Sequence, residues 1–137
     1  MITIFKFSNQ NGEESSNLSR AVAMKITNNE EKADLIEPYV RKLAHLSEYM
    51  LGGSLFSLLF LTYDFPDRKR MIFSFIIGTE YAVIDEIHQL FIDGRSGQVQ
   101  DVFIDSLGIL IGICSMMIIY KIIINILQKR KGGVFNK

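Results

Sequence analysis

The sequence of 137 residues is poor in several features that would define a class of protein. Its one cysteine, Cys114, excludes a disulfide within the chain and lies in an apolar run, where we interpret it as a packing residue. Fifteen basic residues balance fifteen acidic residues, so the net charge does not favour nucleic acid as a partner. The chain also lacks a nucleophile elbow, a His-Glu-xx-His motif and a phosphate-binding loop, so serine, cysteine and P-loop chemistries have no support.

The N-terminus lacks a secretory signal. Residues 1–7 (MITIFKF) are shorter than the apolar core of a signal, and no small-residue cleavage site follows them. What is present instead is a sharp change of composition, from a polar segment to a stretch over residues 43–128 rich in Leu, Ile, Phe, Val and Met. The length predicts a single domain over residues 1–137.

The apolar stretch divides into three segments, each with the roughly 20 residues that a membrane-spanning helix requires. They are residues 43–63, 71–92 and 102–124. A water-soluble bundle would expose charged faces along every helix, and the apolar halves of these segments carry none. The predicted fold is therefore an all-α membrane protein, a bundle of three transmembrane helices. A polar N-terminal segment (1–40) precedes the bundle and a basic tail (125–137) follows it.

The basic residues predict how the helices are oriented. The connection at 64–70 holds three of them and the tail four, whereas the opposite connection, 93–101, holds only Arg95. Because cytoplasmic loops carry an excess of lysine and arginine, we predict a multi-pass protein of the cell membrane with a cytoplasmic C-terminus. Arg41 and Lys42 count against this orientation.

Two features of the N-terminal segment predict structure before the first span. Leu18, Val22 and Ile26 recur at a spacing of four, which is typical of an amphipathic helix lying at the membrane interface. Pro38 suits the first turn of the helix that becomes the first span.

Because successive spans run in opposite directions, the polar ends of the three helices lie at one membrane face. We predict a polar pocket there, under the outer leaflet. Its predicted residues are Arg41, Lys42, His45, Glu48, Tyr49, Asp85, Glu86, His88, Gln89, Arg95, Asp101 and Asp105.

Spacing within the third span supports this interpretation. Asp101, Asp105, Gly108 and Gly112 share one helical stripe, and the pair of glycines four residues apart allows another helix to approach closely. The acidic residues on that stripe therefore face the bundle, as membrane carboxylates usually do. Glu80, in the middle of the second span, is interpreted as a buried hydrogen-bonding residue.

Several of these residues have simpler interpretations. Arg41, Lys42 and Glu86 could be solvated charges at the interface, and the histidines could hydrogen-bond neighbouring helices. Asp101 could be an N-terminal cap of the third helix and nothing more. Asp105 lies too deep in the span to be a cap. Its simpler interpretation is a structural one, in which it forms a buried pair with the side chain of Arg95 or of a histidine.

Four segments resemble the VanZ-like family of bacterial membrane proteins. They are FSNQNGEESSNLS (7–19), RKLAHLSEYMLGG (41–53), DEIHQLFIDGRSG (85–97) and QDVFIDSLGILIG (100–112). The resemblance implies a helical bundle in the cytoplasmic membrane, usually of four spans. Residues 1–7 (MITIFKF) resemble the last turns of the first span, which implies either that the start codon is placed too late or that this copy is truncated. The founding member is associated with low-level resistance to the glycopeptide teicoplanin.

Two functions remain open. In the first, the pocket binds or shields a cell-envelope component. In the second, the chain is a membrane enzyme in which Asp101 and Asp105 share a divalent cation that acts on a lipid-linked phosphate by phosphotransfer or hydrolysis. The candidate catalytic residues are His45, Glu48, Asp85, His88 and Arg95. Expected partners are membrane lipids, a lipid-linked envelope precursor and a second copy of the chain, but no nucleic acid.

Overall fold

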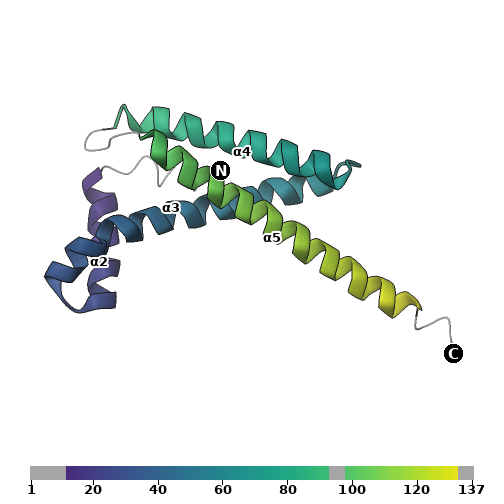
Figure 1. Ribbon diagram of the computed structural model, residues 1–137, viewed down its shortest axis with the longest axis horizontal. Helices are drawn as coiled ribbons and strands as arrows, with labels where there is room; N and C mark the ends of the chain where they lie inside the picture. The colour runs from purple at the N-terminus through teal and green to yellow at the C-terminus, as the bar shows by residue number, and fades with distance from the viewer. Residues whose placement is uncertain (1–11, 93–97, 133–137) are drawn as a thin grey trace.

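The computed structural model describes residues 12–92 and 98–132, and this part of the chain is all-helical (Figure 1). Its helices are α2 (Gly12–Thr27), α3 (Glu30–Leu61), α4 (Asp67–Gln89) and α5 (Val99–Gly132). No strand occurs in these residues, so the all-α prediction is confirmed for them. The three predicted spans fall within α3, α4 and α5, apart from a few residues at their ends.

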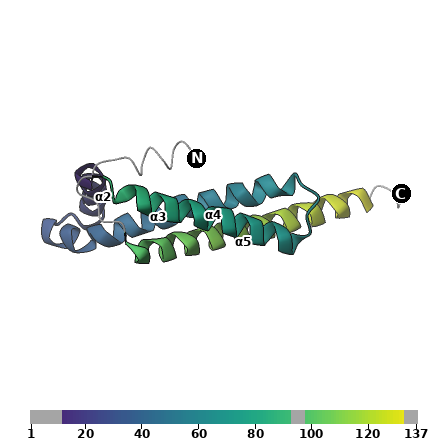
Figure 2. The same cartoon turned by 90° about the horizontal axis from the view of Figure 1, so that it is seen from above.

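The three long helices form an elongated bundle in which the chain reverses direction after α3 and again after α4 (Figures 1 and 2). Among these four helices, α3 and α5 make the most extensive contact, and α4 packs against both. Toward its C-terminus, α5 extends past the other helices (Figure 1). The end of α4 and the start of α5 therefore lie at the same end of the bundle.

Glycines bring α3 and α5 into backbone contact. A Cβ atom on Gly108 would lie 2.5 Å from the carbonyl oxygen of Leu46, and one on Gly112 would overlap the carbonyl of Met50. Ser54 on α3 donates a hydrogen bond of 3.1 Å to the carbonyl oxygen of Gly112. The close approach predicted from the Gly108–Gly112 spacing is confirmed.

The buried apolar core is small. It consists of Tyr49, Ala82, Ile109 and Ile113, and the side chain of Ile109 also fits over Gly78 on α4. In contrast, many large apolar residues are exposed along all three helices; Leu55, for example, has 59% of its surface exposed. A water-soluble protein rarely exposes so much contiguous apolar surface, because burying it is the main driving force of folding.

Within the described residues, α5 is the one helix that is both long enough and apolar enough to qualify by composition as a membrane span. The qualifying stretch runs over Val99–Arg130. Polar residues exclude the other two long helices from this criterion: α4, for example, carries Glu80, Asp85 and Glu86 in its second half. The structure thus supports one span by composition.

A group of polar contacts lies at the end of the bundle where α4 begins. The connection was predicted to extend to residue 70, but α4 already begins at Asp67, so Arg70 belongs to the helix. Arg70 is only 7% exposed, pairs with Asp67 at 3.2 Å and lies over the ring of Tyr120 on α5, 5.6 Å from its centroid. Lys121 pairs with the same aspartate at 3.3 Å.

α2 and the start of α3 form a tight helical hairpin. Asn28 has a φ of 50°, a left-handed conformation that asparagine tolerates better than most residues, and it reverses the chain between the two helices. Ala23 and Ala33 are fully buried where the helices meet, and Arg20 pairs with Asp34 at 2.7 Å. Small residues at the crossing allow this close packing.

The hairpin confirms one prediction and corrects another. The predicted helix α2 forms, and its apolar stripe of Leu18, Val22 and Ile26 is exposed, whereas its location at the membrane interface stays a prediction. Pro38, however, lies eight residues after α3 begins at Glu30, so it is inside the helix rather than in its first turn. The helix tolerates this proline because the Asp34 carbonyl, which loses its hydrogen-bond donor, belongs to an exposed residue.

Asn29 caps α3, since its side chain accepts a hydrogen bond of 3.1 Å from the backbone N–H of Lys32. Replacing Asn29 with alanine is expected to destabilise the hairpin by about 1 kcal/mol, because an orphan N–H loses its partner. Faster amide hydrogen exchange in the first turns of α3 would show this. Asn17→Ala, at an exposed position within α2, is the control and should leave exchange in α3 unchanged.

Candidate functional site

The candidate site is a cluster of polar side chains where α3, α4 and α5 meet at one end of the bundle. α4 supplies residues from its last turn and a half, α5 from its first turns, and α3 from the turn around Tyr49. The up-and-down path of the chain brings these segments together although they are far apart in sequence (Figure 1). Three of the four residues predicted from α4 are buried: Asp85, Glu86 and Gln89.

Asp85 is the best-connected residue of the cluster. Its Oδ2 accepts hydrogen bonds of 3.0 Å from the Tyr49 hydroxyl on α3 and from the Gln89 side-chain amide one helical turn away. All three side chains are at least 95% buried, and Oδ1 of Asp85 has no hydrogen-bond partner within the described residues. Asp85 therefore faces α3, where Tyr49 holds its carboxylate.

Asp105 on α5 is fully buried, and neither of its carboxylate oxygens has a hydrogen-bond partner among residues 12–92 and 98–132. Four other acidic side chains lie close enough to act on it electrostatically: Glu86, Asp85, Asp101 and Glu48. A buried polar group normally finds a partner, because losing its hydration without one is costly. Asp105 is therefore the least satisfied group in this part of the structure.

Glu86 has a role that the sequence did not reveal. One interpretation made it a solvated charge at the interface, but it is only 6% exposed, so that interpretation is wrong. Its Oε2 accepts a hydrogen bond of 2.8 Å from the backbone N–H of Gln98, just before α5 begins. A carboxylate at this position satisfies a free N–H near a helix start and complements the positive end of the helix dipole. Glu86 thus ties the end of α4 to the start of α5.

The remaining predicted residues are less buried or lie outside the described residues. His45, Glu48, His88 and Asp101 are half-buried, and Lys42 is exposed. Arg41 pairs with Glu37, one turn earlier in α3, at 3.0 Å. Asp101 lies inside the first turn of α5, which begins at Val99, so it is not the N-cap. Arg95 lies outside the described residues, and its predicted pairing with Asp105 stays a prediction.

Within the described residues, no three histidine, cysteine, aspartate or glutamate side chains are grouped in a way that could hold a metal ion. Asp101 and Asp105 lie one turn apart on α5, but no third ligand from residues 12–92 and 98–132 completes a group with them. The metal-dependent alternative therefore gains no support from this geometry.

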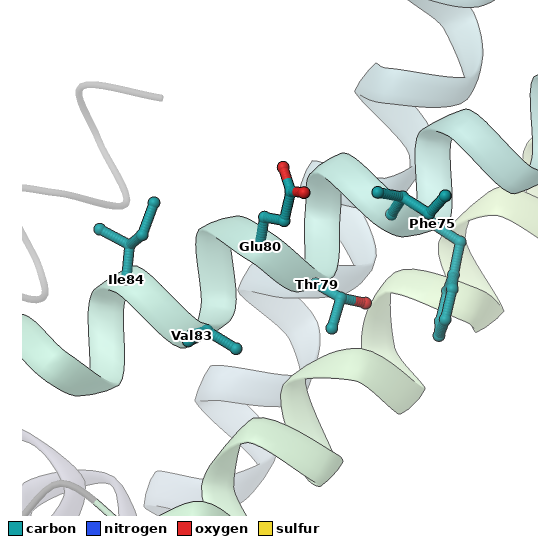
Figure 3. Close-up of a pocket in the computed structure, with 6 residues that line it drawn as sticks. Phe75, Thr79, Glu80, Val83 and Ile84 are labelled. Carbon is teal, nitrogen blue, oxygen red and sulfur yellow. The ribbon is translucent and has the colours of Figure 1, made fainter.

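A shallow hollow of about 470 Å³ lies away from the cluster, on the outer side of α4 (Figure 3). Its lining residues are Phe75, Ile76, Thr79, Glu80, Val83 and Ile84. None of these belongs to the predicted polar pocket, whose central side chains pack against one another. Glu80 is exposed in this hollow, so the prediction that it is buried is wrong.

The fold and the cluster together define a class: an all-α bundle with an apolar exterior, one strongly apolar helix and acidic residues buried at one end. A family model described as VanZ/LLP1 matches residues 1–123. The chain belongs to the VanZ/LLP1 family, a membrane-associated one, as the resemblance implied. No curated protein and no solved structure matches it.

Proposed function

We propose that α4, α5 and the part of α3 from residue 43 onward cross the membrane. Two groups of polar contacts, the acidic cluster and the Asp67–Arg70–Lys121 group, lie at opposite ends of the bundle. Along α4 they are separated by 22 residues, from Asp67 to Gln89, which is about 33 Å of helix. A hydrocarbon core is about 30 Å thick. Large apolar residues are exposed along α3, α4 and α5 between these two ends, which supports this placement.

The orientation follows from the basic residues. The first turn of α4 holds Arg68, Lys69 and Arg70, and the end of α5 holds Lys129 and Arg130. Both lie at the end of the bundle opposite the cluster. The positive-inside rule assigns that end to the cytoplasm. The acidic cluster is then near the outer face, and the α2–α3 hairpin lies beside it with the exposed stripe of Leu18, Val22 and Ile26 toward the interface.

In this arrangement the cluster binds or shields a component of the cell envelope. This activity would give glycopeptide resistance of the kind associated with the founding member of the VanZ-like family. The observation that carries this proposal is Asp105, a fully buried carboxyl without a partner in the described residues, surrounded by four further acids. Such a group has unused capacity to accept hydrogen bonds. A ligand that presents an amine or amide group from the outer leaflet would satisfy it and offset the excess of negative charge.

Asp105→Asn tests this proposal in a complementation assay for glycopeptide susceptibility. The substitution keeps the shape of the side chain and removes its acid, so we expect the protective effect of the chain to be lost. Stability should not fall, because an amide at this position is not repelled by the neighbouring carboxylates. Ser47→Ala, at an exposed position in α3, is the control. Full protection by Asp105→Asn at equal expression would contradict the proposal.

A further inference from the structure

The end of the bundle where α4 begins carries an excess of positive charge. Six charged residues occupy the first turn of α4, the connection before it and the turn of α5 that contacts it: Arg68, Lys69, Arg70, Lys121, Asp64 and Asp67. Four positive charges against two negative ones leave a net charge of +2. Arg68, Lys69 and Lys121 are exposed, so a ligand can reach them. An anionic partner would balance the excess.

The charge of Arg70 is only partly neutralised. Its guanidinium folds back to the start of α4, where Nη1 pairs with Asp67 at 3.2 Å and Nη2 donates a hydrogen bond of 3.3 Å to the carbonyl oxygen of Phe65. The same aspartate also pairs with Lys121 at 3.3 Å, and the buried Nε of Arg70 has no partner within the described residues. One carboxylate thus serves two cations, one of which is only 7% exposed. A further anion beside them would stabilise this arrangement.

The start of α4 also offers backbone donors. Its N-cap is Pro66, and no side chain from the described residues caps the helix there. The N–H of Arg70 is the first that bonds to a carbonyl of the helix, at 3.1 Å from the oxygen of Pro66. The N–H groups of residues 67–69 are therefore available to a ligand, and together with the helix dipole they favour a phosphate group at this point.

A cluster of aromatic side chains adjoins these charges. Its rings have centroids between 5.6 and 6.2 Å apart and belong to Phe60, Tyr63, Phe65 and Phe73. Phe65 joins the two groups, because its carbonyl accepts the hydrogen bond from Arg70. Tyr63 and Phe73 are exposed, and tyrosine is enriched where proteins cross the membrane–water interface. The charged group therefore borders apolar surface, which the chains of a lipid can cover and a free phosphate ion cannot.

We propose that the start of α4 binds an anionic phospholipid, such as phosphatidylglycerol. The lipid phosphate contacts Arg68, Lys69 and the free N–H groups of the first turn, and its acyl chains lie along the aromatic cluster and the exposed apolar side chains of α4. In the orientation proposed above, this end of the bundle lies at the cytoplasmic leaflet, where basic residues attract anionic lipids. The phosphate supplies the negative charge that Asp67 alone does not.

Native mass spectrometry of the purified full chain in a neutral detergent measures this binding. Phosphatidylglycerol should bind at least about tenfold more tightly than phosphatidylcholine, whose headgroup has no net charge. Arg68→Gln combined with Lys69→Gln removes two exposed charges and should lower the affinity for phosphatidylglycerol about tenfold. Lys129→Gln combined with Arg130→Gln removes the same charge from exposed positions near the end of α5 and should leave the affinity unchanged.

Three results would overturn the inference. Equal affinities for the two lipids would show that the phosphate and its charge are not recognised. Equal losses in the two double variants would show that positive charge anywhere at this end is sufficient. Displacement of phosphatidylglycerol by inorganic phosphate at about millimolar concentration would show that the site takes a free anion rather than a lipid.

Unfolding by SDS gives a second measurement and checks the fold. Without added lipid, the Arg68→Gln and Lys69→Gln double variant should unfold at the SDS concentration of the parent, because both side chains are exposed. Added phosphatidylglycerol should raise that concentration for the parent and not for the variant, since a ligand stabilises only the state that binds it. Equal stabilisation of the two proteins would contradict the lipid site.

The inference rests on the proposed function only for the placement of α4 in the membrane, and the two can fail separately. Asp105→Asn should leave phosphatidylglycerol binding unchanged, whatever it does to glycopeptide susceptibility. If the chain stays in the membrane fraction after an alkaline carbonate wash but shows no preference for phosphatidylglycerol, the lipid site alone is wrong. If the wash releases the chain, α4 does not cross the membrane and both proposals fall.

Discussion

Replacing Gly112 with valine is expected to separate α5 from α3. A side chain at this position would overlap the carbonyl of Met50, which is backbone and therefore has little room to move. The hydrogen bond from Ser54 to the Gly112 carbonyl would be lost with the contact. Overpacking of this kind costs about 3 kcal/mol, and more when backbones must separate. Unfolding of the purified protein by SDS titration in mild detergent would measure the loss.

The matched control for Gly112→Val is Ser115→Val, three residues further along α5. Ser115 is exposed, so the added methyl groups meet no neighbouring helix and stability should change little. A Gly112→Val protein that unfolds at the same SDS concentration as the parent would show that the α3–α5 contact is not as close as described.

The second large effect is expected at Tyr49, which contributes both to the apolar core and to the acidic cluster. Tyr49→Ala removes a ring that is 98% buried and leaves a cavity between α3 and the other two helices, at a cost of about 4 kcal/mol. Tyr49→Phe keeps the ring but removes the hydroxyl that donates to Asp85. This smaller change should cost about 1.5 kcal/mol, because a buried carboxylate loses one of its two donors.

Comparing the parent protein, Tyr49→Phe and Tyr49→Ala by the same SDS titration separates the hydrogen bond from the packing. Asp85→Ala, alone and combined with Tyr49→Phe, completes a double-mutant cycle, and the two substitutions should be strongly non-additive because their groups are in direct contact. Additive effects would contradict the hydrogen bond between Tyr49 and Asp85.

Much of the fold follows from patterns that are local in the sequence. Three apolar stretches of about 20 residues, separated by short polar connections, predict α3, α4 and α5 because helix length and hydrophobicity are local properties. The pair Gly108 and Gly112 predicted the close packing of α5, since small residues four apart leave a groove along one side of a helix. The stripe of Leu18, Val22 and Ile26 predicted α2 for the same kind of reason.

The environment of individual charges was predicted less well. Glu80 and Glu86 lie six residues apart on one helix, and the sequence alone gave the wrong environment for both: Glu80 is exposed and Glu86 is buried. Which side of α4 faces α3 and α5 depends on how the helix is rotated in the bundle. Neighbouring charged residues give conflicting signals about that rotation. The start of α3, misplaced because of Pro38, depended on the left-handed turn at Asn28.

The sequence by itself determined that the chain is helical, that it carries an apolar bundle and that its acids concentrate near the ends of particular helices. Those properties depend on composition and on spacing along one helix. Only the tertiary structure decided that Tyr49 holds Asp85, that Glu86 reaches Gln98 and that Asp105 is enclosed without a partner in the described residues. Each of these depends on the rotation and separation of helices that are distant in the chain, and no local pattern specifies them.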